Sequence, residues 1–230
     1  MQEFDPNTFA GITRLFPLSG VVMFPHAVLP LHIFEPRYRQ MTHDALMSDK
    51  LITIVQPRNP KEDTLRGPAL ETVGCLGQII MHERLADGRY NMLLAGLKRV
   101  RLDDEFRRPD KLYREARVTL LDDTQAAEVH PGCAAELTDR FLELLKKHDS
   151  GDAMTAALRR AVKQRADNGV LSDLVAQALT LPSFLKQALI EEARVPERVE
   201  ALLRILRPLT PDLITDIEPK DGYPPSFSLN

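Results

Sequence analysis

The sequence predicts an α+β fold in which a β unit precedes a helical unit. Up to residue 121, short segments alternate apolar and polar residues, the pattern of half-buried strands. After Asp122 and Asp123 the apolar residues recur at helical spacing instead. Turn signals separate the short strands and indicate a closed or sandwich-like β unit. We therefore expect a β unit over 11–121, a helical subdomain over 122–207 and an extended, proline-containing tail over 208–230.

The most distinctive stretch runs from Leu15 to Arg39 and reads LFPLSGVVMFPHAVLPLHIFEPRYR. Its apolar residues 15–24 predict a buried strand, which Ser19-Gly20 interrupts with a bend. The prolines at 25 and 30 predict a loop or corner between them, and residues 31–34 predict a second strand. Most of this stretch is typical of a folding device rather than of a catalytic site.

A helix is expected directly after that stretch, over residues 36–48. Pro36 suits the first helical turn, and Glu35 suits the positive end of the helix. Tyr38 is then expected to pack on the β unit, and Arg37 to pair with a nearby carboxylate or carbonyl group.

Further strands are predicted by short apolar or alternating segments with turn residues between them. Asp87-Gly88 is a hairpin signal, whereas Gly74 and Gly77 indicate a bulge or a close backbone approach. Arg99 and Arg101 are expected to point outward to solvent. The predicted strands are 51–55, 73–83, 90–94, 98–102 and 113–121.

Four to five helices are predicted in the second unit. The first has an apolar stripe between Cys133 and Leu145, and the next has one over 154–162. A third stripe covers 170–179, while Pro182 and Pro196 begin the last two helices. Short connections between such helices are typical of a bundle.

The composition is that of an ordinary globular protein. The chain has 230 residues, 43% of them hydrophobic and 27% charged, with a net charge of −3. Residues 1–121 carry +2 and residues 122–230 carry −5, so neither part has the basic excess of a nucleic-acid binder. Two cysteines, Cys75 and Cys133, suit a reducing cytoplasm, and no segment has the ~18 apolar residues that span a membrane.

The segment FPLSGVVMFPHAVLPLHIFEPRYRQM resembles the opening of the Lon-protease N-terminal, substrate-binding domain, in the stand-alone form that lacks the ATPase and protease domains. The blocks GCLGQIIMHERLADGRYNMLLAGLKRVRL and LTLPSFLKQALIEEARVPERVEALLRIL are similar to later parts of the same family. His26 and Ala86 depart from it, since a small residue and a proline are usual there. The matching positions of the middle block are Gly74, Gly77, Asp87, Gly88, Arg89, Gly96 and Arg99.

The resemblance implies a PUA-like β-barrel with an inserted helix, followed by a helical-bundle subdomain. It also implies a non-catalytic module that binds unfolded or apolar polypeptide segments or a partner protein and that acts as an adaptor for proteolysis in protein quality control. A groove between the two subdomains is a natural place for such a ligand. The residues that we expect to contact it are His26, His32, Phe34, Arg37, Tyr38 and Arg89.

Two other functions are open at this point. PUA-like barrels also bind RNA, which would require a basic patch formed by Arg84, Arg89, Lys98, Arg99 and Arg101. A hydrolase would require a base beside Cys75, Cys133 or Ser183. We do not expect RNA binding, because neither part of the chain has a basic excess. We do not expect a hydrolase, because Ser183 suits a helix start and Lys186, which follows it, suits solvent.

No cofactor or metal is expected. The sequence contains no phosphate-binding G-x-x-x-x-G-K-[ST] motif, and its six histidines include no H-E-x-x-H pair. The sequence leaves the oligomeric state and the physiological ligand open.

Overall fold

A computed structural model describes residues 4–59, 67–147 and 167–207. Within these ranges no helix has the length and apolarity that crossing a membrane requires. The predicted tail over 208–230 and the predicted helical stripe over 154–162 lie outside the described residues.

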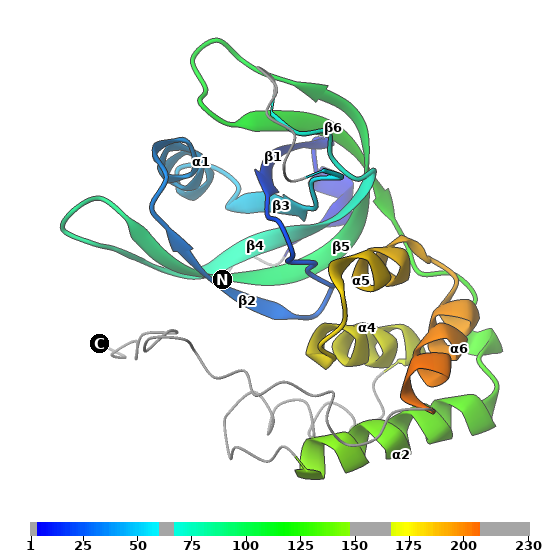
Figure 1. Cartoon of the computed structure of the whole chain (residues 1–230). Coiled ribbons are helices and arrows are strands. Elements are labelled where there is room, and N and C mark those ends of the chain that lie inside the picture. Colours follow the sequence, from blue (N-terminus) through cyan, green and yellow to red (C-terminus); the bar gives the residue numbers. More distant parts are fainter. Residues whose placement is uncertain (1–3, 60–66, 148–166, 208–230) are drawn as a thin grey trace.

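The strands come first along the chain, with one α-helix among them, and the other α-helices follow (Figure 1). Two short 3-10 helices, η1 and η2, precede β1 and α2. The bounds are η1 Pro6–Thr8, β1 Ile12–Pro17, β2 Val28–Ile33, α1 Pro36–Leu46, β3 Leu51–Val55, β4 Val73–Arg84, β5 Tyr90–Phe106, β6 Arg114–Leu121, η2 Ala126–Glu128, α2 Pro131–Lys147, α4 Asn168–Ala178, α5 Ser183–Glu191 and α6 Val195–Leu206.

The six strands form one mixed sheet in the order β2-β5-β4-β3-β1-β6. β1 and β3 are parallel, and the other neighbours are antiparallel. β5 also pairs with β6, so the pairings of β5, β4, β3, β1 and β6 form a closed circuit. Among the described strands, β2 joins this circuit through β5 alone, which leaves it with an unpaired edge.

The first strand, predicted over residues 15–24, ends earlier than predicted. β1 stops at Pro17, and residues 18–27 are turns and irregular loop. Met23 and Phe24 are nevertheless fully buried, and the Phe24 amide donates to Oε1 of Gln177 in α4 at 3.0 Å. The apolar run therefore packs in the core as a loop, a role that apolar periodicity does not distinguish from a strand.

The two strands predicted over 90–94 and 98–102 are one long strand, β5. Gly96 lies inside it rather than at a strand end. Its amide donates to the Ala27 carbonyl at 2.8 Å, and a Cβ at this position would collide with the backbone of Phe24. The glycine therefore marks a close approach of the loop before β2 to β5.

The predicted roles of the other strand glycines are confirmed. A Cβ on Gly74 would lie 2.5 Å from the Ile54 carbonyl oxygen in β3. At Gly77 the register between β4 and β5 shifts, as in a β-bulge.

The helix α1 begins as predicted, with Glu35 at its N-cap and Pro36 in its first turn. It ends at Leu46, two residues before the predicted end. The ring of Tyr38 lies 4.3 Å from that of Phe16 in β1, which holds the helix against the sheet.

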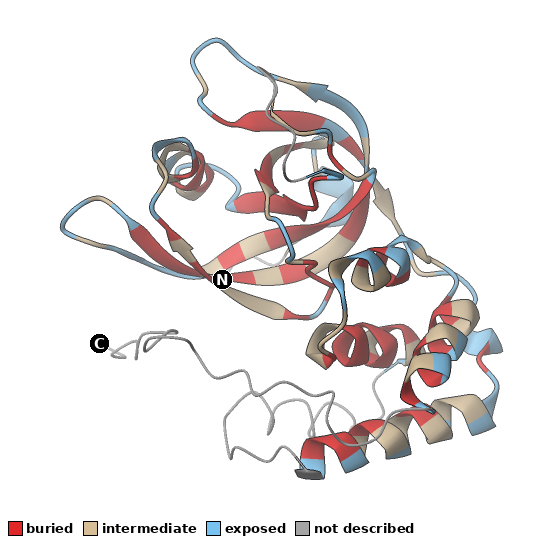
Figure 2. Ribbon diagram, in the orientation of Figure 1, coloured by how far each residue is buried: buried red, intermediate tan, exposed pale blue. Residues whose placement is uncertain are grey.

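The helices α2, α4, α5 and α6 gather beyond the other end of the sheet from α1 (Figure 1). α2 buries the predicted stripe of Leu137, Phe141, Leu144 and Leu145. These side chains belong to one hydrophobic cluster with residues of the sheet such as Phe16 and Met92. Figure 2 shows the buried residues on the strands and on the facing sides of these helices.

Candidate functional site

The end of β2 and the hairpin between β4 and β5 bring three of the predicted contact residues together. Nδ1 of His32 lies 2.7 Å from Oδ1 of Asn91, and Nε2 of His32 lies 3.3 Å from Nη1 of Arg89. The Phe34 ring stacks near His32 with 6.2 Å between the centroids, and its side chain is 60% exposed. Asp87 fixes Arg89 from the hairpin turn with an ion pair of 2.6 Å.

An apolar strip continues from this point across three strands. Pro30 of β2 faces Leu93 of β5, which in turn faces Met81 of β4. These residues lie two positions from His32, Asn91 and Glu83, which form the next row of the same face. Pro30 and Leu93 are half-buried and Met81 is exposed, so the face offers apolar contact beside polar groups.

His26 lies at the opposite end of β2. It is exposed and has a φ of 65°, in the left-handed region that favours glycine. Its amide donates to the Gly96 carbonyl at 2.9 Å. The small residue that is usual at this position fits the observed backbone, and His26 is not part of the His32 group.

Arg37 and Tyr38 lie on α1 and line a cavity that is separate from the His32 group. The guanidinium of Arg37 stands 4.5 Å from the centroid of the Tyr38 ring and pairs with Glu35 at 2.8 Å, as predicted. Burial raises the pKa of Tyr38, against the opposing positive charges of Arg37 and Arg114. Both residues line a cavity of about 200 Å³.

The groove expected between the two subdomains does not open where the sheet meets α5 in the described part of the chain. The crevice between the sheet and α5 has a volume of about 0 Å³, lined among others by Val22, Ile54, Val73 and Ile190. The amide of the Gln187 side chain crosses it and donates to the Val73 carbonyl at 3.0 Å. A ligand therefore has no space at this place.

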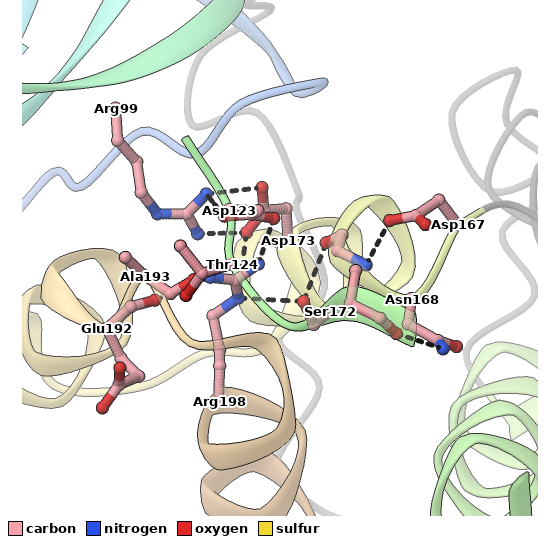
Figure 3. A network of polar contacts seen from close by, with 12 residues as sticks. Arg99, Asp123, Thr124, Asp167, Asn168, Ser172, Asp173, Glu192, Ala193 and Arg198 are labelled. Carbon is pink, nitrogen blue, oxygen red and sulfur yellow. Dashed lines mark hydrogen bonds and ion pairs between the residues drawn. The ribbon is translucent and has the colours of Figure 1, made fainter. Parts of the chain in front are cut away.

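A buried charge network fixes the same junction, and the prediction that Arg99 is solvated is wrong (Figure 3). The Arg99 side chain is 2% exposed and forms a bidentate pair with Asp173 of α4, and it pairs with Asp123 at 2.9 Å. Arg198 of α6 is fully buried and binds Asp123 at 2.6 Å and the Ser172 hydroxyl at 2.9 Å. Burial opposes the charge of Arg99, but Asp173 and Asp123 hold its pKa above the usual value.

This network joins the sheet to the helices, and the sequence alone does not indicate it. Arg99 comes from β5, Asp123 from the connection after β6, and the other charges from α4 and α6. A strand residue next to a basic neighbour, Lys98, gives no sign of burial. The only available signal is the family-like spacing of Gly96 and Arg99, which marks the position without giving its partner.

Lys186 is also less exposed than predicted. Its ammonium donates to the Gln177 carbonyl at 2.9 Å, and burial lowers its pKa to about 8. Ser183 opens α5, as predicted.

The three possible nucleophiles have no base within the described part of the chain. Burial raises the pKa of Cys75 to about 12, and its thiol contacts the Leu76 carbonyl at 3.5 Å. The side chains of Cys133 and Ser183 make no hydrogen bond to a described histidine or carboxylate. Over the same residues, no group of three or more His, Cys, Asp or Glu side chains is placed to hold a metal ion.

The basic patch that RNA binding would require is not assembled. Arg99 points into the network, Lys98 pairs with Asp122 at 2.5 Å and Arg101 with Asp103 at 3.0 Å. Arg84 and Arg89 lie at the far end of the β4–β5 hairpin from these residues.

A family model described as the ATP-dependent protease La (LON) substrate-binding domain matches residues 13–207. Curated relatives include Lon protease of Xanthomonas oryzae, 26% identical over 84% of this chain, and Lon protease of Azorhizobium caulinodans, 24% identical over 87%. The chain spans only 22% and 23% of the lengths of these two relatives.

Two solved structures have the same fold. The Lon N-terminal domain protein from Xanthomonas campestris has a TM-score of 0.60 and 20% identity, and the match covers 84% of this chain and 97% of that one. The N-terminal domain of the Mycobacterium avium complex Lon protease has a TM-score of 0.68 and 18% identity, and the match covers 86% and 100%.

Proposed function

Because the chain belongs to the family of ATP-dependent protease La (LON) substrate-binding domains, we propose that it recognises unfolded or apolar polypeptide segments. The family resemblance seen in the sequence is thereby confirmed, and membership supports a substrate-recognition module. Beyond family membership, we propose that the ligand is apolar, that it binds at the place described below and that the chain acts as an adaptor in protein quality control.

We further propose that the sheet is a PUA-like barrel. Support comes from the closed circuit of strand pairings, to which β2 is attached as an additional strand. In the same proposal the chain divides into a barrel subdomain over 11–121 and a helical subdomain over 122–207, with the tail over 208–230. It acts without catalysis, in a cytoplasmic setting.

The edge of β2 with which no other described strand pairs is the observation that carries the proposed binding mode. An extended polypeptide can pair with such an edge through backbone hydrogen bonds, and neighbouring pockets then select its side chains. β2 is six residues long, about 20 Å at the rise of a strand. One extended segment therefore reaches from His26 to the group formed by His32, Phe34 and Arg89.

The apolar strip of Pro30, Leu93 and Met81 lies beside this edge, and Phe34 ends it. A large exposed aromatic side chain next to polar partners is typical of a residue that contributes strongly to binding. Arg89, held by Asp87, supplies guanidinium donors for the backbone of the ligand, and His32 helps to position it.

The test is a binding titration with a labelled, chemically unfolded model protein. Phe34→Ser should weaken binding about tenfold, because it removes an aromatic contact worth roughly 1.5–3 kcal/mol when fully buried. Phe184→Ser is the matched control, since Phe184 is also a phenylalanine, is 70% exposed and lies on α5 away from β2.

Failure of the unfolded protein to bind saturably would refute the proposed function. Equal losses in the two variants would place the binding surface elsewhere than β2.

A further inference from the structure

The hydrogen bonds between β2 and β5 determine which backbone groups of β2 face its outer edge, the edge with which no other described strand pairs. The Gly96 amide donates to the Ala27 carbonyl at 2.8 Å, directly before Val28 begins to pair with Ala95. In an antiparallel ladder, residue pairs that exchange hydrogen bonds alternate with pairs that do not. Val28 and Ala95 therefore form a pair without mutual hydrogen bonds.

The same alternation determines the orientation of Pro30. The register from Val28 to Ile33 has no shift, so Pro30 and Leu93 form the next pair without mutual hydrogen bonds. The carbonyl groups of Val28 and Pro30 and the amide of Val28 consequently point away from β5, toward the outer edge. Because the Pro30 nitrogen carries no hydrogen, this edge offers two acceptors and one donor over residues 28–30.

The side chains of β2 divide between two faces. Leu31 and Ile33 are buried in the core, whereas Pro30 is half-buried on the opposite face. On that face Pro30 begins the apolar strip that continues through Leu93 and Met81. A strand added at the outer edge would therefore place one of its own side chains beside Pro30 and extend the strip.

These two features define the ligand residue that lies opposite Pro30. Antiparallel addition repeats the pairing that β2 already makes with β5, and antiparallel pairs are slightly more stable than parallel ones. In that direction the ligand residue donates its amide to the Pro30 carbonyl, and its side chain lies next to Pro30 on the apolar strip. The carbonyl of the same ligand residue meets no donor from β2, because Pro30 has none.

We propose that Pro30 sets the register of the polypeptide ligand and selects an apolar residue other than proline at the ligand position opposite itself. The ligand residues on either side of that position turn their amides away from β2, so they tolerate the loss of the amide hydrogen. This inference rests on the proposed function and deepens it, because it states which extended segments the edge of β2 prefers. The position of proline in a segment matters as well as its apolar content.

The test uses the full chain and a fluorescent seven-residue peptide with a central leucine between threonines, which favour the extended conformation. Binding is measured directly and by competition with a chemically unfolded model protein. N-methylation of the central leucine removes its amide hydrogen and should weaken binding about tenfold. N-methylation of either neighbouring threonine should change binding by less than about twofold. Replacing the leucine by serine should weaken binding about fivefold, because the apolar strip loses a contact.

Variants of the chain locate the effect at β2. Pro30→Val supplies the missing amide hydrogen and keeps an apolar side chain, so it should tighten the binding of the unmodified peptide about three- to tenfold. Pro109→Val is the matched control, because this proline is exposed in the turn between β5 and β6, and it should leave binding unchanged. Circular dichroism of each variant verifies that it is folded, and the peptide series on the wild type does not depend on either variant.

The outcomes separate the two claims. If the unfolded protein binds but the peptide does not compete with it, or the three methylated peptides bind alike, the role of Pro30 is overturned and the proposed function stands. Equal binding by folded Pro30→Val and Pro109→Val also overturns that role. So does peptide binding that declines as the chain is concentrated and dimerises, because a second copy then occupies the edge. Absence of saturable binding by the unfolded protein overturns both claims.

Discussion

Arg99 carries a full positive charge on a side chain that is only 2% exposed. Removing a charge from water costs free energy, so the carboxylates of Asp173 and Asp123 must offset the buried charge of Arg99. Arg198 offsets the negative charge of the two aspartates in turn. The two arginines and two aspartates balance in charge. Removing one member leaves the others buried without a counter-charge, which costs more than the pair itself contributes.

Arg99→Ala should therefore reduce the free energy of unfolding by about 3–5 kcal/mol. The measurement is urea unfolding followed by circular dichroism. Arg101→Ala is the control on the same strand, because Arg101 has a 52% exposed side chain and an exposed pair with Asp103. It should change stability by less than about 1 kcal/mol. Similar effects of both substitutions would contradict the structural role of the network.

Lys186 gives a prediction about pH. Burial lowers its pKa to about 8 in the folded chain, whereas an unfolded lysine has a pKa of about 10.4. Between these values the unfolded chain binds more protons, so the folded state gains stability as the pH rises. Below about pH 8 both states are protonated, and the destabilising effect of burying the charge is complete.

The stability of the wild type relative to Lys186→Met should thus increase by about 1–2 kcal/mol from pH 7.5 to pH 10, allowing for solvent screening. Chemical denaturation at several pH values measures it. Lys146→Met, which changes an exposed lysine on α2, gives the background. If both variants follow the same pH profile, Lys186 is not buried in solution.

At the scale of elements, the packing of β3 against β4 depends on the absence of a side chain. A Cβ on Gly74 would lie 2.5 Å from the Ile54 carbonyl oxygen, and further atoms of β3 lie 3.3 Å away. Backbone cannot move aside as a flexible side chain can, so a substitution must separate the two strands.

Gly74→Ala should destabilise the chain by about 1–3 kcal/mol. Gly132→Ala is the opposite case, since this glycine lies in the first turn of α2 and a methyl group there would meet only the side chain of His130. It should be neutral or stabilise the chain by less than about 1 kcal/mol. Thermal unfolding of the two variants provides the comparison, and a neutral Gly74→Ala would show that the strands tolerate separation.

β2 is the element on which the proposed function depends. It contains Pro30, which has no amide hydrogen, and prolines are confined to edge strands or bulges. Such a residue discourages continuous pairing with a second copy of the same strand, while the remaining residues can still receive a ligand. The edge is therefore suited to transient rather than permanent strand addition.

At the scale of the whole molecule, local patterns predicted the elements better than they predicted how the two parts meet. Glu35-Pro36 specified the start of α1, and Asp87-Gly88 specified the hairpin, because both signals act over a few residues. The helical stripe around Phe141 was equally clear from its spacing. Family resemblance, rather than periodicity, supplied the order of the parts.

The errors have a common physical cause. Phe24 and Arg99 are buried and hydrogen-bond to α4, which lies 153 and 74 residues later in the chain. The alternation of apolar and polar residues within a strand carries no information about a partner that far away in the chain. The same holds for the cavity lined by Arg37 and Tyr38, to which Gly67 and Arg114 come from two other segments.

The long-range core also affects where a ligand can bind. One hydrophobic cluster includes residues of both the sheet and the helices, and the charge network and Gln187 close the junction. In the proposed function, a polypeptide therefore binds to an outer surface of the described residues rather than at this junction. The edge of β2 is a surface of that kind.

Amide hydrogen exchange, measured with and without a saturating unfolded polypeptide, tests this claim most directly. The account predicts slower exchange in the presence of the ligand over residues 28–34 and 89–93, and unchanged exchange in α2 and α6. Slower exchange confined to the helices, or no change at saturation, would contradict recognition at the edge of β2.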